Sequence, residues 1–75
     1  MVRLSADKYL EALAVYRGGE LFFPLIAAVL LGTQDGVIYA DDADEPSQFY
    51  VEHAFGFAQL FGRPNEAFEE ALANY

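Results

Sequence analysis

The segment from Leu21 to Leu31 is apolar throughout, and Pro24 is its only residue that disfavours a helix. A helix that is hydrophobic on every side belongs in a protein core. Proline is tolerated only in the first turn, because deeper in the helix it removes a hydrogen bond and clashes with the preceding turn. The sequence therefore predicts a buried helix from Phe23 to Leu31. Gly32 follows at the C′ position, where the backbone commonly adopts the left-handed conformation.

Composition limits the function of the chain. Twelve Asp and Glu residues against four Lys and Arg residues give a formal net charge of −8, which repels the phosphates of nucleic acids and of anionic lipids. The apolar segment is far shorter than the ~20 residues of a membrane-spanning helix, and the start of the chain lacks the apolar region of a signal peptide. The chain contains no cysteine, so it has neither a disulfide framework nor a thiol nucleophile. We expect a cytoplasmic protein that binds neither nucleic acid nor membrane.

The chain is short for its apolar content. With 75 residues it has room for one domain, and a domain of this size buries only about 60% of the surface that its unfolded chain exposes. Yet 55% of the residues are hydrophobic, including seven Phe and five Tyr. We therefore predict a single small domain over residues 1–75 whose remaining apolar surface meets a protein partner or a second copy of the chain.

A further helix is expected before the apolar segment. Residues 2–4 form a possible short strand, and Ser5 is predicted to cap the helix by accepting a backbone amide on its hydroxyl. Apolar residues then recur at helical spacing, at Ala6, Tyr9, Leu10, Leu13 and Tyr16. This pattern predicts an amphipathic helix that ends at Gly18-Gly19.

Three strands and a last helix are expected after the apolar segment. Asp35-Gly36 is a turn signal before a strand over 37–40. Alternating apolar residues predict strands over 48–55 and 57–61, with Gly56 at the reversal between them. Pro64-Asn65 opens a helix with one apolar face, made of Phe68, Leu72 and Tyr75. The predicted fold is α+β, an antiparallel sheet of three to four strands packed on helices, in the order (β)-α-α-β-β-β-α.

This order resembles the N-terminal half of the GCN5-related N-acetyltransferase (GNAT) fold. The residues that carry the resemblance are the apolar helix through Leu31-Gly32, the strand from Gly36 to Asp42, the Glu45-Pro46-Ser47 connection and the stretch from Gly56 to Gly62. The resemblance implies acyl transfer from acetyl-CoA to an amine. It also implies that backbone amides at a helix N-terminus after the fourth strand hold the cofactor's pyrophosphate.

The sequence departs from the family at that cofactor loop. The family pattern is Gln or Arg, two variable residues, Gly, one further residue, and Gly or Ala, whereas this chain has Gly62-Arg63-Pro64-Asn65-Glu66-Ala67. Pro64 supplies no amide, and Glu66 repels phosphate. The family's fifth strand and its later catalytic tyrosine are expected beyond residue 75. We therefore assign no catalytic, cofactor-binding or metal-binding residue.

Two functions are consistent with these observations. The first is a noncatalytic or truncated acetyltransferase-like module that acts by protein–protein association. The alternative is the acceptor-side part of a GNAT-type N-acyltransferase completed by another chain or by further residues, and only this alternative uses acetyl-CoA. The residues expected to line the acceptor side or the interface are Tyr39, Tyr50, Glu52 and His53.

Two polar features suggest a more specific chemistry. Histidine is the residue type whose unperturbed pKa lies near neutrality, and His53 stands beside Glu52. Neighbours in a strand point to opposite faces, however, which favours a structural histidine. A second feature is an acidic cluster with the ligand chemistry for a hard cation, made of Asp41, Asp42, Asp44 and Glu45. This cluster lacks the ligand spacing of a calcium loop, so we expect a solvated acidic loop.

Overall fold

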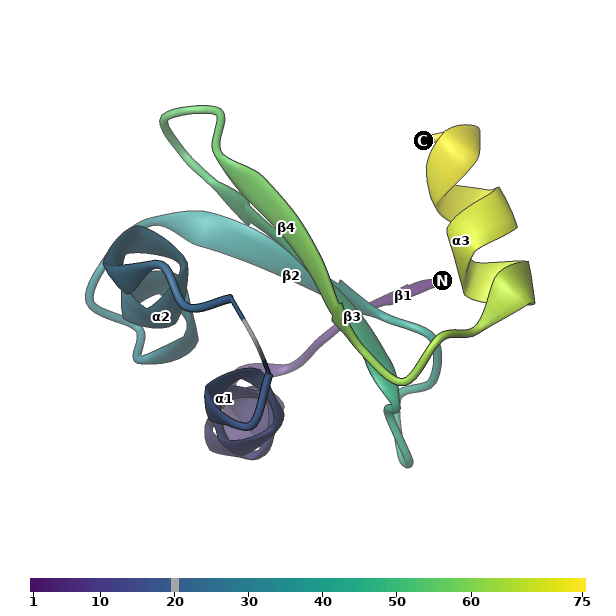
Figure 1. Cartoon of the computed structure of the whole chain (residues 1–75), viewed down its shortest axis with the longest axis horizontal. Coiled ribbons are helices and arrows are strands. Elements are labelled where there is room, and N and C mark those ends of the chain that lie inside the picture. The colour runs from purple at the N-terminus through teal and green to yellow at the C-terminus, as the bar shows by residue number, and fades with distance from the viewer. Residues whose placement is uncertain (20) are drawn as a thin grey trace.

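Four short strands form one antiparallel sheet, with α1 and α2 on one face and α3 on the other (Figure 1). The structure is a computed structural model that describes residues 1–19 and 21–75. The strands lie in the order β1-β2-β3-β4. In chain order the elements are β1 (Val2–Arg3), the 3-10 turn η1 (Ala6–Lys8), α1 (Tyr9–Arg17), α2 (Pro24–Leu30), β2 (Gly36–Ala40), β3 (Gln48–His53), β4 (Ala58–Gly62) and α3 (Glu66–Ala73). The predicted α+β order is confirmed, with β1 as the fourth strand.

Helix α2 forms as the sequence predicts, although it is one residue shorter at each end. Pro24 occupies the first turn, where its missing N–H would have had no partner within the helix. Gly32 follows the helix with φ at 77°. The amide of Gly32 donates to Val29 over 3.0 Å, and the amide of Thr33 donates to Ala28 over 2.9 Å. These two bonds satisfy the carbonyls that the end of the helix would otherwise leave free.

The core lies between α1, α2 and the inward face of β2 and β3. Ile38 and Ala40 on β2 lie directly opposite Val51 and Phe49 on β3, and all four are fully buried. The helices and the segment after β1 complete this core with Leu4, Ala12, Leu13, Tyr16, Ile26, Ala27, Val29 and Leu30. Helix α2 packs closely enough on the sheet that Gly36 has no room for a side chain. A Cβ there would lie 2.6 Å from the Glu52 carbonyl oxygen and 2.9 Å from the Val29 methyl groups.

The start of the first helix differs from the prediction. The Ser5 hydroxyl caps no backbone amide. Instead it donates to the carboxylate of Asp7, and the backbone carbonyl of Ser5 accepts the amide of Lys8 over 3.0 Å. A carboxylate two residues away competes successfully for the hydroxyl, and the first turn is a 3-10 turn rather than a capped α-helical turn.

The predicted strand over 48–55 ends earlier, at His53. The amide of His53 donates to the Phe57 carbonyl over 2.6 Å, and the amide of Ala54 donates to Asp35 over 3.1 Å. The first bond closes the turn between β3 and β4, with Gly56 at φ of 96°, and the second joins the end of β3 to the residue before β2. Phe55, the last residue of the predicted strand, lies in this turn instead and is 79% exposed.

The place of Pro24 in α2 gives a stability test. We expect Pro24→Ala to change the free energy of unfolding by less than ~1 kcal/mol, because this position needs no N–H donor. Val29→Pro should lower it by ~3 kcal/mol or more, because it breaks the interior of the helix. Urea denaturation of both variants measures the difference, and equal midpoints would contradict the assignment of this segment as a helix.

Candidate functional site

Three of the four predicted site residues lie together on the α3 face of the sheet. Tyr39 on β2 and Tyr50 on β3 are direct cross-strand partners, and Glu52 lies two residues further along β3 on the same face. Tyr75 joins them, because its ring centroid lies 5.1 Å from that of Tyr39 and 6.2 Å from that of Tyr50. The Tyr75 hydroxyl donates to the Tyr39 hydroxyl over 3.3 Å. We call Tyr39, Tyr50, Glu52 and Tyr75 the tyrosine cluster.

The electrostatics of the tyrosine cluster raise the pKa of two of its phenols, those of Tyr75 and Tyr50. The hydrogen bond to Tyr39, desolvation and the negative charge of Glu52 raise the pKa of Tyr75 to about 12. Burial, followed by the charge of Glu52, raises the pKa of Tyr50. Protonated phenols donate hydrogen bonds and do not accept protons as bases. At neutral pH Tyr50 and Tyr75 are therefore hydrogen-bond donors rather than phenolates, and the ring contacts of Tyr75 hold the end of α3 against the sheet.

The fourth predicted residue, His53, lies on the opposite face of β3 and is only 2% exposed. Its Nδ1 accepts the amide of Phe55 over 3.0 Å, and its Nε2 lies 3.3 Å from the Gln34 Oε1. Because the amide must be a donor, these partners assign the proton to Nε2. Both ring nitrogens are thus engaged inside the protein. This geometry fits the structural histidine that alternation along the strand predicts.

Asp41 joins the loop between β2 and β3 to the start of α3. Its Oδ1 accepts the amides of Ser47 over 2.8 Å and Gln48 over 3.3 Å. Its Oδ2 accepts the Ser47 hydroxyl and the Asn65 side-chain amide, the latter over 2.9 Å. Burial opposes the charged form of Asp41, but these hydrogen bonds outweigh it and lower the pKa of the carboxyl group. Asp41 is therefore a structural carboxylate within the predicted acidic loop.

The rest of the acidic loop does not converge on a cation site. Asp42 Oδ2 accepts the amides of Asp44 over 3.2 Å and Glu45 over 2.8 Å, so it shapes its own turn. Within residues 1–19 and 21–75, no group of three acidic or His side chains is placed to hold a metal ion.

The network around Asp41 can be tested by substitution. Asp41→Ala leaves the Ser47 amide and the Asn65 side chain without their charged acceptor, so we expect the free energy of unfolding to fall by ~2–3 kcal/mol. Asp44→Ala is the matched control, with a change within about 0.5 kcal/mol. Chemical denaturation at neutral pH measures both.

The same residue predicts a pH dependence. The pKa of Asp41 is lowered in the folded state, whereas an unfolded Asp titrates near 3.9. Its contribution to stability is therefore fully present above about pH 4 and is lost as the pH falls through the folded-state pKa. As the pH falls, the free energy of unfolding should therefore decrease less in the Asp41→Ala variant than in the unsubstituted protein. Parallel acid profiles for the two proteins would contradict this role.

The segment that corresponds to the family's pyrophosphate loop uses its amides within the protein. The amide of Arg63 donates to Ser47 over 2.8 Å, and the amide of Asn65 donates to the Gln48 side chain over 2.9 Å. The Asn65 side chain caps α3 by accepting the Phe68 amide over 3.1 Å. Pro64 has no amide. Two amides of this segment are therefore engaged within the protein, and Pro64 supplies none.

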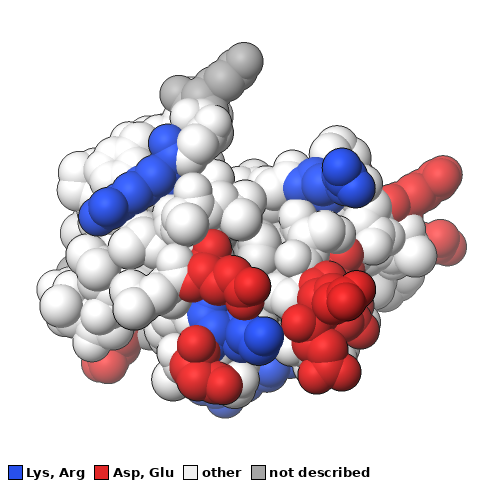
Figure 2. Space-filling model, turned by 90° about the horizontal axis from the view of Figure 1, so that it is seen from below, with Lys and Arg blue, Asp and Glu red and all other residues white. Residues whose placement is uncertain are grey.

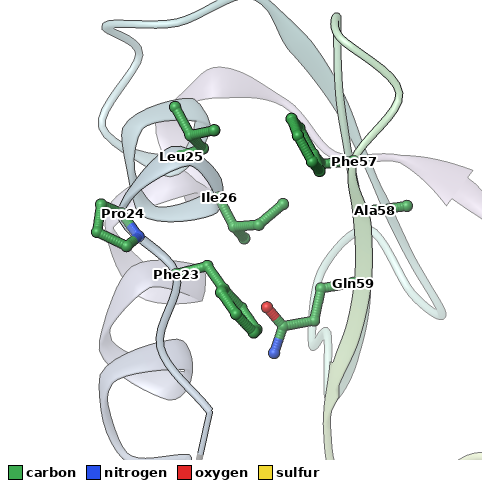
Figure 3. A pocket seen from close by; sticks show the side chains of 7 residues that line it. All are labelled: Phe23, Pro24, Leu25, Ile26, Phe57, Ala58 and Gln59. Atoms are coloured by element: carbon green, nitrogen blue, oxygen red, sulfur yellow. The ribbon is translucent and has the colours of Figure 1, made fainter.

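An apolar groove of about 310 Å³ lies between the start of α2 and β4 (Figure 3). Its lining residues are Phe23, Pro24, Leu25, Ile26, Phe57, Ala58 and Gln59. In Figure 3 the side chains of Phe23 and Ile26 on one wall point toward Phe57 and Gln59 on the other. Sequence reasoning did not identify this groove, although Gln59 between two phenylalanines on one strand face was a detectable signal.

The hydroxyl of Tyr16 fixes the walls of this groove. It donates to the Gln59 Oε1 over 2.6 Å and accepts the Phe23 amide over 2.7 Å. These two bonds tie α1 to the N-cap of α2 and to β4. Because the Tyr16 hydroxyl donates to it, the Gln59 side chain is held in place on the β4 wall of the groove.

Strand β4 presents a free backbone edge beside the groove. In the described part of the chain, β4 pairs with β3 alone. The bonds from His53 to Phe57 and from Arg63 to Ser47 show which β4 positions bond to β3, and in an antiparallel pair these positions alternate. The backbone groups of the intervening positions therefore point away from β3. These residues, Ala58, Leu60 and Gly62, are all exposed.

A second hollow, of about 270 Å³, runs along β4 on the helix side. It is lined by Tyr16, Gly19, Leu21 and residues 59–62. Four phenylalanines near the start of α2 and in the β3–β4 turn are more than half exposed, namely Phe22, Phe23, Phe55 and Phe57. The free edge of β4 therefore lies within a largely apolar surface.

No protein family matches this sequence, and none of the curated proteins or solved structures compared with it matches either. The resemblance to acetyltransferases thus depends on the motifs and the element order given above.

Among the described residues, no helix has the length and apolarity to cross a bilayer. On the face shown in Figure 2, acidic side chains gather toward one side, while the basic ones are scattered and form no continuous patch.

Proposed function

We propose that this chain is a noncatalytic, acetyltransferase-like module that acts by protein–protein association, through addition of a strand to the free edge of β4. The observation that carries the proposal is the outward-facing backbone of Ala58, Leu60 and Gly62 beside two apolar hollows. Free strand edges pair readily with extended segments of other chains.

The edge of β4 lacks the usual protection against such pairing. Proteins commonly shield an edge with charged residues, especially Lys, or with Pro. The stretch 57–62 contains neither a charged residue nor Pro. Leu60, at the centre of the strand, is 42% exposed, so an added strand would cover apolar side chains as well as backbone groups.

The absence of catalysis is supported by the chemistry of the site residues. His53 has both ring nitrogens engaged within the protein. The amides of Arg63 and Asn65 are bonded within the protein. Under this proposal the tyrosine cluster stabilises the fold, and the interface lies at β4.

We expect that the chain neither binds acetyl-CoA nor transfers its acetyl group. In the loop at residues 62–67 the amides of Arg63 and Asn65 are bonded within the protein, Pro64 has no amide, and the net charge of −8 opposes the cofactor's phosphates. Isothermal titration with acetyl-CoA should give no saturable heat. Micromolar binding would instead favour the alternative, the acceptor-side part of an N-acyltransferase in which Tyr39 and Glu52 face the amine.

Strand addition can be tested without knowing the natural partner. We would append to Tyr75 a Gly-Ser linker of about 20 residues, which has a mean span of about 25 Å, followed by an alternating Val-Thr strand. The longest extent of the domain is 29 Å, so the strand can reach β4. Tethering gives a millimolar effective concentration, and therefore even weak pairing becomes visible.

The expected readout is hydrogen exchange at the outward amides of β4. Exchange at Ala58, Leu60 and Gly62 should slow by about tenfold or more in the tethered protein, because each amide gains an acceptor. The control carries the same linker and a strand with alternate Pro residues, which cannot complete the ladder. Equal exchange in the two proteins would overturn the proposed function.

A further inference from the structure

The symmetry of the β4 edge identifies its partner. We infer that the added strand is β4 of a second copy of this chain, paired antiparallel about a twofold axis at Leu60. This inference rests on the proposed function, since it names the polypeptide that supplies the strand.

The outward-facing positions form a self-complementary ladder. Antiparallel pairing centred on Leu60 sets Leu60 opposite its own copy and Ala58 opposite Gly62 of the other copy. Because the backbone groups of these residues point away from β3, each opposed pair exchanges two hydrogen bonds. The three pairs form a continuous ladder along the whole of β4, and the two sheets join into one.

The side chains fit this register on the α3 face. Each Leu60 meets the other Leu60 at the axis, where both are otherwise 42% exposed. On either side, Ala58 lies opposite Gly62, and this small pair leaves room for the leucines. A shift of the register by two residues would place Leu60 opposite Gly62 or Ala58 and would separate the two leucines, so this register buries the most apolar surface.

The side chains also fit on the helix face. Positions 57 and 63 lie just outside β4, so pairing about Leu60 sets Phe57 of one copy beside Arg63 of the other. A guanidinium group close to an aromatic ring is attracted to its face, and the exposed Phe57 and Arg63 have this chemistry. The two Arg63 residues lie at opposite ends of the joined strands. No like charges therefore face each other along residues 57–63.

The net charge separates this inference from pairing with an oppositely charged protein. Two copies with a net charge of −8 repel each other over long range, and salt screens that repulsion. Self-association should therefore strengthen as the salt concentration rises. A basic partner would show the opposite dependence.

The test uses the absence of cysteine in the chain. Leu60→Cys brings two thiols together at the axis, where opposed residues have Cα atoms about 5.5 Å apart, within the range of a disulfide. Under mild oxidation we expect a covalent dimer to form more than tenfold faster than with Leu10→Cys. Leu10 on α1 is 70% exposed and lies outside the proposed interface.

Light scattering supplies the second readout. The unmodified chain should have the mass of a dimer at high micromolar concentration, and the fraction of dimer should increase with the salt concentration. Leu60→Lys should be monomeric, because it places two positive charges together at the axis, while Leu10→Lys should remain dimeric. Equal cross-linking of the two Cys variants, or a dimer unaffected by Leu60→Lys, would overturn the inference. Protection by the tethered strand would still support strand addition, so the two proposals fail separately.

Discussion

Burial of one face of β2 and β3 under α2 is the constraint on which the rest of the structure depends. The buried residues of α2 are Ile26, Ala27, Val29 and Leu30, and they pack over the fully buried side chains of Ile38, Phe49 and Val51. Although the helix is apolar on every side, Pro24 and Leu25 stay exposed. The close approach of Val29 to Gly36 shows how tightly the helix sits over the start of β2. The outer strand β4 lies at the margin of this core. It is held there by its pairing with β3 and by Phe61, whose ring packs against Tyr16 and Phe49.

The elements with strong local signals were predictable from the sequence. Pro24 and Gly32 mark the two ends of α2, and Asp35-Gly36 marks the start of β2, because proline and glycine restrict or permit backbone angles regardless of their surroundings. The opposite orientations of Glu52 and His53 also follow from the two-residue period of a strand. These signals need no knowledge of distant residues.

The polar contacts that position the site were not predictable, because they join residues distant in sequence. The Tyr16 hydroxyl meets Gln59 across 43 positions, and Asp41 meets Asn65 across 24. The run of acidic residues after β2 predicts a solvated loop. Only the fold shows that the carboxylate of Asp41, among these residues, accepts four hydrogen bonds. Ser5 failed as a cap for a related reason: its hydroxyl had a nearby carboxylate as a competing partner. A short sequence pattern does not decide between two such acceptors.

The uncovered position of β4 connects the fold to the proposed function. Helices α1 and α2 cover the sheet from one side, and the tyrosine cluster draws the end of α3 toward β2 and β3 on the other. Neither layer extends over the outward edge of β4, so its backbone and Leu60 stay accessible. Under the proposed self-association, a strand from a second copy occupies this edge and bonds to the outward backbone groups of Ala58, Leu60 and Gly62. The helices and the tyrosine cluster can then keep the domain folded while the edge serves association, because the two tasks use different residues.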